Sequence, residues 1–155
     1  MIQRIQSIYL LAVASVAFIL IWVDPIYAVF QSDTGLEIGL SFCNNGSFTA
    51  NKTLYTPELL SLGILISVGM IALINVFLYR NRILQMRITK IAGILVIVFW
   101  LVLLVRFFMV SRQYSDQYNL GFQIIWPLIL LLPVIMAYFA IRRDEDLISS
   151  MDRIR

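Results

Sequence analysis

The sequence contains no histidine and only one cysteine, Cys43. The absence of histidine excludes the commonest general base, bis-histidine haem ligation, zinc sites that include histidine, and Ser-His or Cys-His catalytic arrangements. A single cysteine cannot close a disulfide within the chain, so Cys43 either packs in the interior or forms an intermolecular disulfide. The sequence therefore predicts a non-enzymatic protein with no catalytic residues, no metal site and no cofactor.

Charged residues are scarce as well. They make up 14% of the 155 residues, whereas 61% are hydrophobic, and an ordinary soluble domain carries about 25% charged residues. Four apolar runs approach the roughly 20 residues with which an α-helix crosses a hydrocarbon core, where the backbone has to be helical. The first run lacks a signal-peptide cleavage pattern, so it is interpreted as a retained helix, with a cleaved signal peptide as the alternative. We expect an all-α membrane protein, a four-helix transmembrane bundle in a single domain, with spans at about residues 5–23, 58–79, 90–111 and 120–141.

The basic residues fall mostly on one side of this bundle. With a cytoplasmic N-terminus, nine of the twelve Lys and Arg residues lie in cytoplasmic segments, whereas Lys52 and Arg112 lie outside and Arg106 lies within a span. The nine are Arg4, Arg80, Arg82, Arg87, Lys90, Arg142, Arg143, Arg153 and Arg155. Because translocation of basic loops is disfavoured, this asymmetry predicts a multi-pass protein of the cytoplasmic (inner) membrane with both termini cytoplasmic (N-in/C-in). Membrane lipid is then a partner, and no nucleic-acid partner is expected.

The first outer loop, residues 24–57, is the only long segment between the spans. Three stretches rich in Tyr, Phe, Ile and Thr, at 26–31, 36–42 and 47–55, are separated by two groups of turn-forming residues, the second at 44–46. The pattern predicts a small three-stranded antiparallel β-meander. Such a sheet is too small to be stable alone, so it should pack against the helix ends or against a partner.

The chain around the fourth span carries two further signals. The preceding loop, residues 111–119, is short and polar, and its Tyr114 and Tyr118 are expected at the level of the lipid headgroups. Pro127 and Pro133 interrupt the fourth span. A proline in a membrane helix either kinks it or breaks it at a transport site, and the kink is favoured because no inverted half of the sequence carries a matching interruption.

Three of the polar side chains within the predicted spans are candidates for a site: Arg106, Asn75 and Gln123. Arg106 is only about four residues, or roughly 6 Å, from the outer end of its span. It therefore either snorkels to the interface, pairs with a nearby carboxylate, or binds an anionic group of a substrate or partner. The nearby carboxylates are those of Asp24, Glu58 and Asp116. Asn75 and Gln123 either hydrogen-bond a neighbouring helix or line a transport path together with Arg106.

The cytoplasmic segments supply the remaining candidates. The inner connection, residues 80–90, mixes basic with apolar residues, and the tail, residues 142–155, places its apolar residues on one helical face with charges opposite. The tail either continues the fourth helix or lies on the inner leaflet. We expect these segments to form a cytoplasmic interaction surface. Its candidate residues are Arg80, Arg82, Arg87, Arg142, Arg143, Asp144, Glu145, Arg153 and Arg155.

Three segments carry a resemblance to a known family: residues 1–11, 79–87 and 142–155. They resemble an uncharacterised family of four-span inner-membrane proteins from Bacteroidota, a domain of unknown function. The likeness covers the full length, and it implies a location, a lineage and a topology, with no activity or catalytic residue. The claudin-like group also has four spans and a β-rich first loop. It expects paired cysteines and a nearby tryptophan in that loop, whereas this loop has Cys43 alone.

Three functions from different classes remain open. The first is a small accessory or scaffold protein that binds other membrane or envelope proteins, or a second copy of itself. The second is an oligomeric transporter, channel or lipid-handling protein that uses Arg106, Asn75 and Gln123, although so few polar groups argue against a monomeric pore. The third is a membrane enzyme that works with Asp, Glu, Tyr or Arg alone. The lack of catalytic residues favours the first function, that of an accessory or scaffold protein.

Overall fold

The computed structural model describes residues 3–31, 37–49, 52–78, 81–113 and 118–152. Four helical segments in it are long and apolar enough to cross a membrane, which confirms this part of the prediction and indicates a membrane protein. The first three segments, Ile5–Val23, Leu59–Phe77 and Arg82–Arg112, belong to α1 (Gln3–Val23), α2 (Leu59–Phe77) and α3 (Arg82–Gln113). The fourth segment, Phe122–Leu147, runs through η1 (Phe122–Ile125), α4 (Trp126–Ile129) and most of α5 (Leu131–Asp152).

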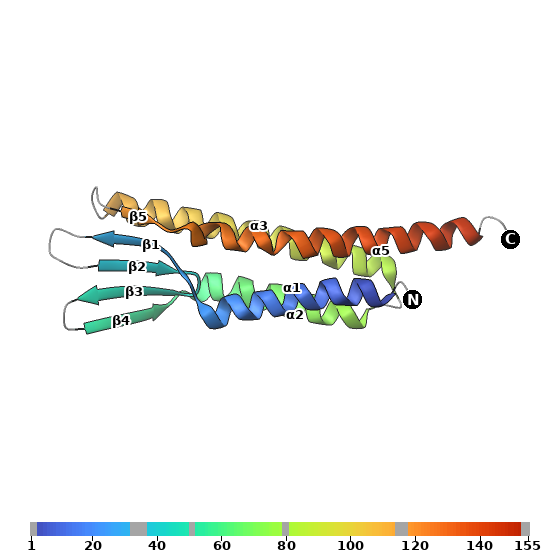
Figure 1. The fold of residues 1–155 in the computed structure, drawn as a ribbon, viewed down its shortest axis with the longest axis horizontal. Helices are drawn as coiled ribbons and strands as arrows, with labels where there is room; N and C mark the ends of the chain where they lie inside the picture. Colours follow the sequence, from blue (N-terminus) through green and yellow to red (C-terminus); the bar gives the residue numbers. More distant parts are fainter. Residues whose placement is uncertain (1–2, 32–36, 50–51, 79–80, 114–117, 153–155) are drawn as a thin grey trace.

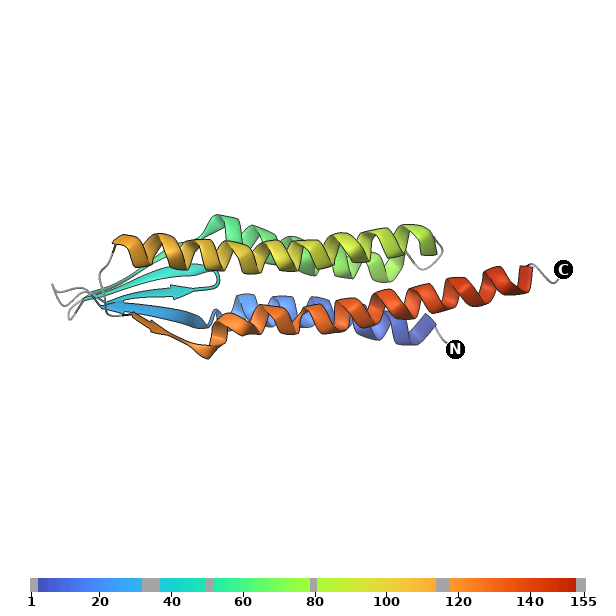
Figure 2. The same ribbon diagram turned by 90° about the horizontal axis from the view of Figure 1, so that it is seen from above.

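The long helices form a four-membered bundle in which α1 and α3 each contact both α2 and α5 (Figures 1 and 2). Their buried residues recur at alternating intervals of four and three, the spacing that brings one residue from each helix into each layer of a bundle core. These residues are Gln6, Leu10, Val13, Ala17 and Leu20 in α1; Ser61, Leu65, Val68, Ala72 and Asn75 in α2; Gln85, Thr89, Ala92, Val96, Phe99 and Leu103 in α3; and Val134, Ala137, Ile141 and Asp144 in α5.

A five-stranded antiparallel sheet continues the bundle at one end, in the order β4-β3-β2-β1-β5. Its strands are β1 (Ile26–Gln31), β2 (Glu37–Ser41), β3 (Asn44–Thr49), β4 (Lys52–Pro57) and β5 (Tyr118–Leu120). The prediction of an all-α protein is therefore wrong, because the sheet is a sizeable part of the fold. We refer to this end of the bundle as the sheet end, and to the opposite end, where α1 begins, as the termini end (Figure 1).

The sheet also differs in detail from the predicted meander. The expected third strand is a hairpin of β3 and β4, and Asn45, predicted in a turn, pairs with Thr56 of β4. The chain reverses earlier, at Phe42 and Cys43. Tyr118, predicted in a polar loop, lies in β5 and pairs with Phe30 of β1. A three-residue strand forms only where another strand offers it an edge, and that contact joins segments far apart in the sequence. Tyr114 lies outside the described residues.

Helix α3 supports the sheet. Its 32 residues correspond to about 48 Å, against about 32 Å for the 21 residues of α1, and the extra length covers one face of the sheet (Figures 1 and 2). The pairing of β1 with β2 is irregular just after Ile26, which turns Tyr27 toward the helix. The Tyr27 hydroxyl donates to the carbonyl of Leu103 (3.3 Å), and the Phe30 ring lies 5.6 Å from that of Phe107.

The fourth span is interrupted at Leu130, between α4 and α5. Pro133 has no N–H to donate, and its ring would clash with the carbonyl of Ile129 in a regular helix. This explains why the helix is interrupted at Leu130, directly after Ile129. The structure therefore shows a one-residue interruption of the fourth span between the two prolines. Helix α5 continues to Asp152, so the tail extends the fourth helix, which is one of the two alternatives left open by the sequence.

Candidate functional site

At the sheet end, Arg106 of α3 binds the turn between β2 and β3. Its Nη1 donates to the carbonyl oxygens of Ser41 (3.2 Å) and Phe42 (3.4 Å), and to the hydroxyl of Ser61 in α2 (3.1 Å). Its Nη2 donates to Oδ1 of Asn45. In the described part of the chain Arg106 makes no ion pair, so its charge is solvated by the turn and by α2. Arg106 thus joins two helices to the sheet.

Two carboxylates hold the same turn. Asp24 directly follows α1 with a left-handed φ of 41°, a conformation that Asp tolerates better than most residues. Its carboxylate accepts hydrogen bonds from the N–H of Cys43 (2.6 Å), the hydroxyl of Ser41 (2.8 Å) and the side-chain amide of Asn44 (2.6 Å). Glu58, which precedes α2, donates its N–H to the carbonyl of Cys43 (2.7 Å) and accepts from the Asn45 side chain (3.2 Å). We name Asp24, Glu58, Arg106 and turn residues 41–45 the junction.

The junction changes the acidity of two neighbouring side chains outside the spans. Burial raises the pKa of the Cys43 thiol to about 12, with a further contribution from Asp24. Burial also raises the pKa of Tyr27 to about 12, while the charge of Arg106 acts in the opposite direction. Cys43 is only 3% exposed, so it packs in the interior, the first of the two alternatives considered above. As a buried, protonated thiol it is not a nucleophile at neutral pH.

At the termini end, Asn75 of α2 and Gln85 of α3 form a reciprocal pair. The Asn75 amide donates to the carbonyl of Gln85 (3.3 Å), and the Gln85 amide donates to the carbonyl of Asn75 (3.2 Å). The Asn75 amide also donates to the hydroxyl of Thr89 (2.8 Å), which itself donates to the Gln85 carbonyl (2.8 Å). Each of these three residues is 1% exposed.

Asp144 of α5 lies at the same end, in contact with α1 and α3. Its carboxylate oxygen Oδ2 accepts from the amide of Gln6, which also donates to the carbonyl of Ala140 (3.3 Å). The guanidinium of Arg82 donates to the backbone carbonyl of Asp144 (3.2 Å), and not to its carboxylate. Gln6 is 3% exposed and Asp144 5%. The two side chains therefore join α1 to α5 inside the bundle.

These residues form one buried layer. Among the side chains that the structure describes, Gln6, Asn75, Gln85 and Asp144 are the buried core residues nearest the termini end, so all four helices contribute one polar side chain. Three of the oxygens in it have no hydrogen-bond partner: Oδ1 of Asn75, Oε1 of Gln85 and Oδ1 of Asp144. Native proteins leave few buried polar atoms unpaired, and each one calls for an explanation. We name Gln6, Asn75, Gln85, Thr89 and Asp144 the polar layer.

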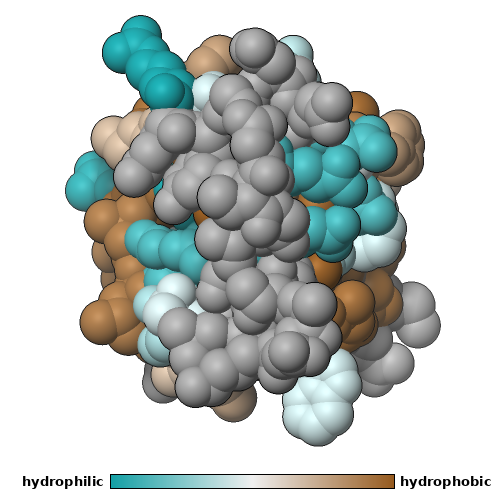
Figure 3. All heavy atoms as spheres, turned by 90° about the vertical axis from the view of Figure 1, so that its left-hand side faces the viewer, coloured by the Kyte–Doolittle hydropathy of each residue, from teal (hydrophilic) through white to brown (hydrophobic). Residues whose placement is uncertain are grey.

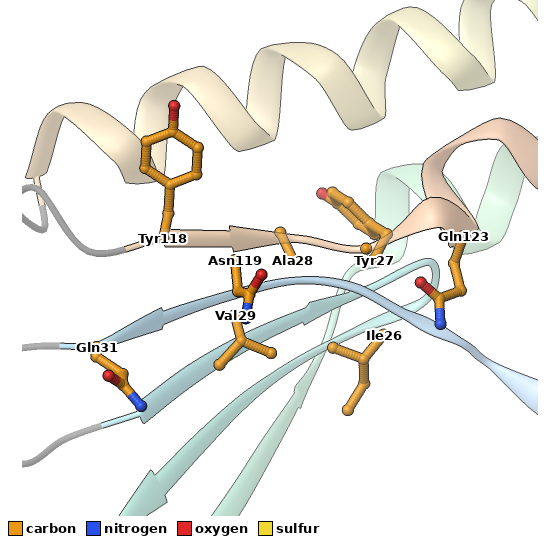
Figure 4. Close-up of a pocket in the computed structure, with 9 residues that line it drawn as sticks. Ile26, Tyr27, Ala28, Val29, Gln31, Tyr118, Asn119 and Gln123 are labelled. Atoms are coloured by element: carbon orange, nitrogen blue, oxygen red, sulfur yellow. The ribbon is translucent and has the colours of Figure 1, made fainter.

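A groove of about 850 Å³ follows β1 and β5 on the sheet (Figure 4). The side chains on the groove side are those of Ile26, Val29, Gln31, Asn119 and Gln123, and they lie on the face away from α3, whereas Tyr118 points toward that helix. None of the residues that line the groove is charged. The surface therefore offers apolar contact area together with side-chain amides.

A family model described as Domain of unknown function (DUF4293) matches residues 2–154, almost the entire chain. The chain belongs to this family. No curated protein matches it. The match confirms the part of the resemblance that concerns an uncharacterised family spanning the full length, and it assigns no activity to any residue of this DUF4293 protein.

The three intramembrane candidates of this DUF4293 protein lie in three different places. Arg106 is in the junction, Asn75 is in the polar layer, and Gln123 is in η1 beside the sheet groove. Arg106 and Asn75 lie at opposite ends of the bundle, and Gln123 lies at the edge of the sheet. The described structure therefore does not bring them together along one path.

The predicted cytoplasmic surface is divided as well. Arg87 is exposed, and the exposed Arg142 pairs with Asp146 at 4.0 Å. Arg143 borders an apolar groove of about 600 Å³ between α1 and α5. Glu145 is partly exposed, whereas Asp144, predicted on the same surface, is buried, and Arg82 is partly buried against it. Arg80, Arg153 and Arg155 lie outside the described residues.

Most of the polar layer was missed from the sequence. Gln6 lies within the first predicted span, and Gln85 and Thr89 lie within the inner connection predicted at residues 80–90. The signal was nevertheless present, because each of these residues continues the alternating spacing of four and three that marks the core positions of its helix.

Proposed function

We propose that this DUF4293 protein is a non-enzymatic accessory or scaffold subunit of the cytoplasmic membrane, which binds another membrane or envelope protein through the groove face of its sheet. The observation that carries the proposal is the groove along β1 and β5, which lies on the face that α3 leaves uncovered (Figure 4). Viewed onto the sheet end, several hydrophilic side chains reach the surface, and hydrophobic ones lie mainly at the left and right sides (Figure 3). This distribution suits a sheet held in water next to the bilayer.

The chemistry of the groove defines the kind of partner. Ile26 and Val29 provide apolar contact area, and Gln31, Asn119 and Gln123 provide amide donors and acceptors without charge. An extended peptide segment with apolar side chains matches such a surface, because its backbone groups can pair with the amides. Binding should therefore depend little on ionic strength, since charge-based recognition is what salt screens.

The packing of the bundle argues against transport as the alternative. Between the junction and the polar layer, the buried core positions of the described helices are apolar, and they include Val13, Val68 and Phe99. A conduction path is normally lined by polar or charged groups. Arg106, the strongest transport candidate, is engaged with the backbone of the turn. The polar groups thus lie at the two ends, and the middle is closed by hydrocarbon side chains.

The experiment is site-specific photo-crosslinking in the native membrane. A photoreactive amino acid at Val29 should give a discrete adduct with one partner, and the double substitution Ile26→Asp and Val29→Asp should reduce co-purification of that partner at least tenfold. The control position is Ile94, which is 60% exposed on α3 in the bundle. A chain that purifies alone and gives no Val29 adduct would overturn the proposal. So would a partner retained equally by the double variant and by the wild type.

The orientation in the bilayer is part of the same proposal. Nine of the twelve basic residues lie in segments assigned to the cytoplasm, so both termini should be cytoplasmic and the sheet should lie on the other side. A reporter that is active only in the cytoplasm, fused after Arg155, should be active. A silent fusion at Arg155 together with an active one in the loop between β1 and β2 would reverse the topology.

A further inference from the structure

We infer that the polar layer is a binding site for a monovalent cation, with Na⁺ as the probe, coordinated by Oδ1 of Asn75, Oε1 of Gln85 and Oδ1 of Asp144. These three oxygens are buried and have no hydrogen-bond partner. They come from the described core positions of α2, α3 and α5 that lie nearest the termini end, which the bundle spacing brings into one layer around the axis. This site is independent of the sheet groove, which lies at the opposite end of the molecule.

The orientation of the two amides is fixed by their surroundings. The nitrogens of Asn75 and Gln85 each donate to a backbone carbonyl, so rotating either amide would place two oxygens against each other. The amide nitrogen of Gln6 is likewise used, because it donates to Asp144 and to the carbonyl of Ala140. The layer thus holds three oxygens without a donor, and the amide nitrogens nearby already donate to other groups. Its occupant has to supply positive charge or new donors.

The charge of the layer favours a monovalent cation. Asp144 supplies one carboxylate, which is 5% exposed, and a buried ionised carboxylate is costly without a compensating charge. Carboxylate and amide oxygens are hard ligands that suit a hard cation. A monovalent ion neutralises Asp144, whereas a divalent ion would leave excess positive charge in a low-dielectric environment. Arg82, whose guanidinium binds the Asp144 carbonyl, makes that excess still less favourable.

The layer also lies near one end of the bundle. Gln6 lies three residues into α1, which begins at Gln3, and Gln85 lies three residues into α3, which begins at Arg82. This corresponds to about 4.5 Å along the helix axis, so the layer lies within one helical turn of the first residues of α1 and α3. On the other side the core continues with Leu10, Ala72 and Ile141, all at most 2% exposed. The site is therefore a dead end and not part of a channel.

The test is the thermal stability of the purified full chain in mild detergent, at constant ionic strength, in sodium chloride or choline chloride. A ligand that binds only the folded state raises Tm, by about 3 to 5 °C at ten times its Kd for a chain of this size. The wild type should show a saturable increase in sodium, and Asp144→Asn should abolish it. Because the new amide can donate to the free oxygens, Asp144→Asn should also raise Tm in choline. Asp146→Asn, a change on the exposed face of the same helix, should retain the full sodium increase.

Asn75→Leu provides a second variant if Asp144→Asn does not fold, and it should weaken the sodium effect at least threefold by removing one ligand. Equal Tm values in sodium and choline for the wild type would overturn the inference, because they would mean that water or a proton satisfies the layer. A sodium increase retained by Asp144→Asn would overturn it as well. An equal increase in potassium chloride would support it and show that the site accepts more than one monovalent ion.

Discussion

The two ends of the helical bundle both bury polar side chains, but they satisfy them differently. At the sheet end, Arg106 brings several donors to backbone carbonyls, and Asp24 brings two acceptor oxygens to donors of the same turn. At the termini end, Asn75 and Gln85 use their nitrogens on each other's backbone and leave both oxygens unpaired. The difference teaches that a complete hydrogen-bond network fixes a structure, whereas an incomplete one retains capacity for a ligand.

The largest effect is expected from breaking the sheet end. Arg106→Leu removes the donors to the carbonyls of Ser41 and Phe42 and to Asn45, and leaves these acceptors unpaired. Loss of charged hydrogen bonds to partly buried acceptors should cost about 3 kcal/mol and lower Tm by about 10 °C. The Tm of Arg106→Lys should lie between those of the wild type and Arg106→Leu, because one ammonium group cannot reach all the acceptors that the guanidinium group reaches. The measurement is thermal unfolding in detergent.

Arg112→Leu is the matched control, since Arg112 is an exposed arginine in the last turn of the same helix. It should change Tm by less than about 2 °C, as surface substitutions usually do. If Arg106→Leu and Arg112→Leu had the same small effect, the junction would not be the element that fixes the sheet to the bundle, and the contrast between the two ends would fail.

A smaller effect is expected from high pH, again at the sheet end. The folded-state pKa of Tyr27 is raised from 10.0 to about 12, so between pH 10 and 12 the unfolded chain loses the phenolic proton while the folded chain keeps it. Stability should therefore be constant well below pH 10 and fall as the pH rises through 10, by about 1.4 kcal/mol at pH 11 for this group. In Tyr27→Phe this part of the decline should be absent. The difference in Tm between wild type and variant, measured from pH 9 to pH 11, should shrink by about 3 °C, and an unchanged difference would refute the assignment.

The smallest effect is expected at the termini end. Because the reciprocal pair leaves two buried oxygens unpaired, replacing both residues by apolar ones removes this penalty together with the bonds. The double substitution Asn75→Leu and Gln85→Leu should therefore change Tm in choline chloride by no more than about 3 °C in either direction. A loss as large as that of Arg106→Leu would show that both ends are stabilised in the same way.

The helices were the most predictable part of the fold. Hydrophobic run length alone predicted the four long apolar helices, because a chain that crosses a bilayer has to be helical there. Strand β1 was also predicted with its observed bounds, Ile26–Gln31. Strand β5 was not, because Tyr118–Leu120 has no local strand signal and depends on an edge provided by residues far away in the sequence. The position of the turn at Phe42 and Cys43 was missed for a similar reason, since it is imposed by Asp24, Glu58 and Arg106.

The candidate sites show the same limit. Arg106 was noticed because a charged residue within an apolar run is conspicuous, but its acceptors are backbone carbonyls of the turn, which carry no sequence signal of their own. The groove depends on the pairing of β1 with β5 and was not foreseen. The polar layer could have been found from core periodicity, had Gln85 and Asp144 been treated as helix core residues and not as members of charged segments.

Helix α3 is continuous from Arg82, beside the polar layer, to the strands that it covers beyond Arg106. The helix is about 48 Å long. If one end stays fixed, a tilt of about one degree moves the other end by about 0.8 Å, which is enough to alter a hydrogen bond. Side chains at one end are thereby mechanically linked to the sheet at the other, without any polar path through the middle. The helix that supports the sheet at one end therefore also forms part of the polar layer at the other.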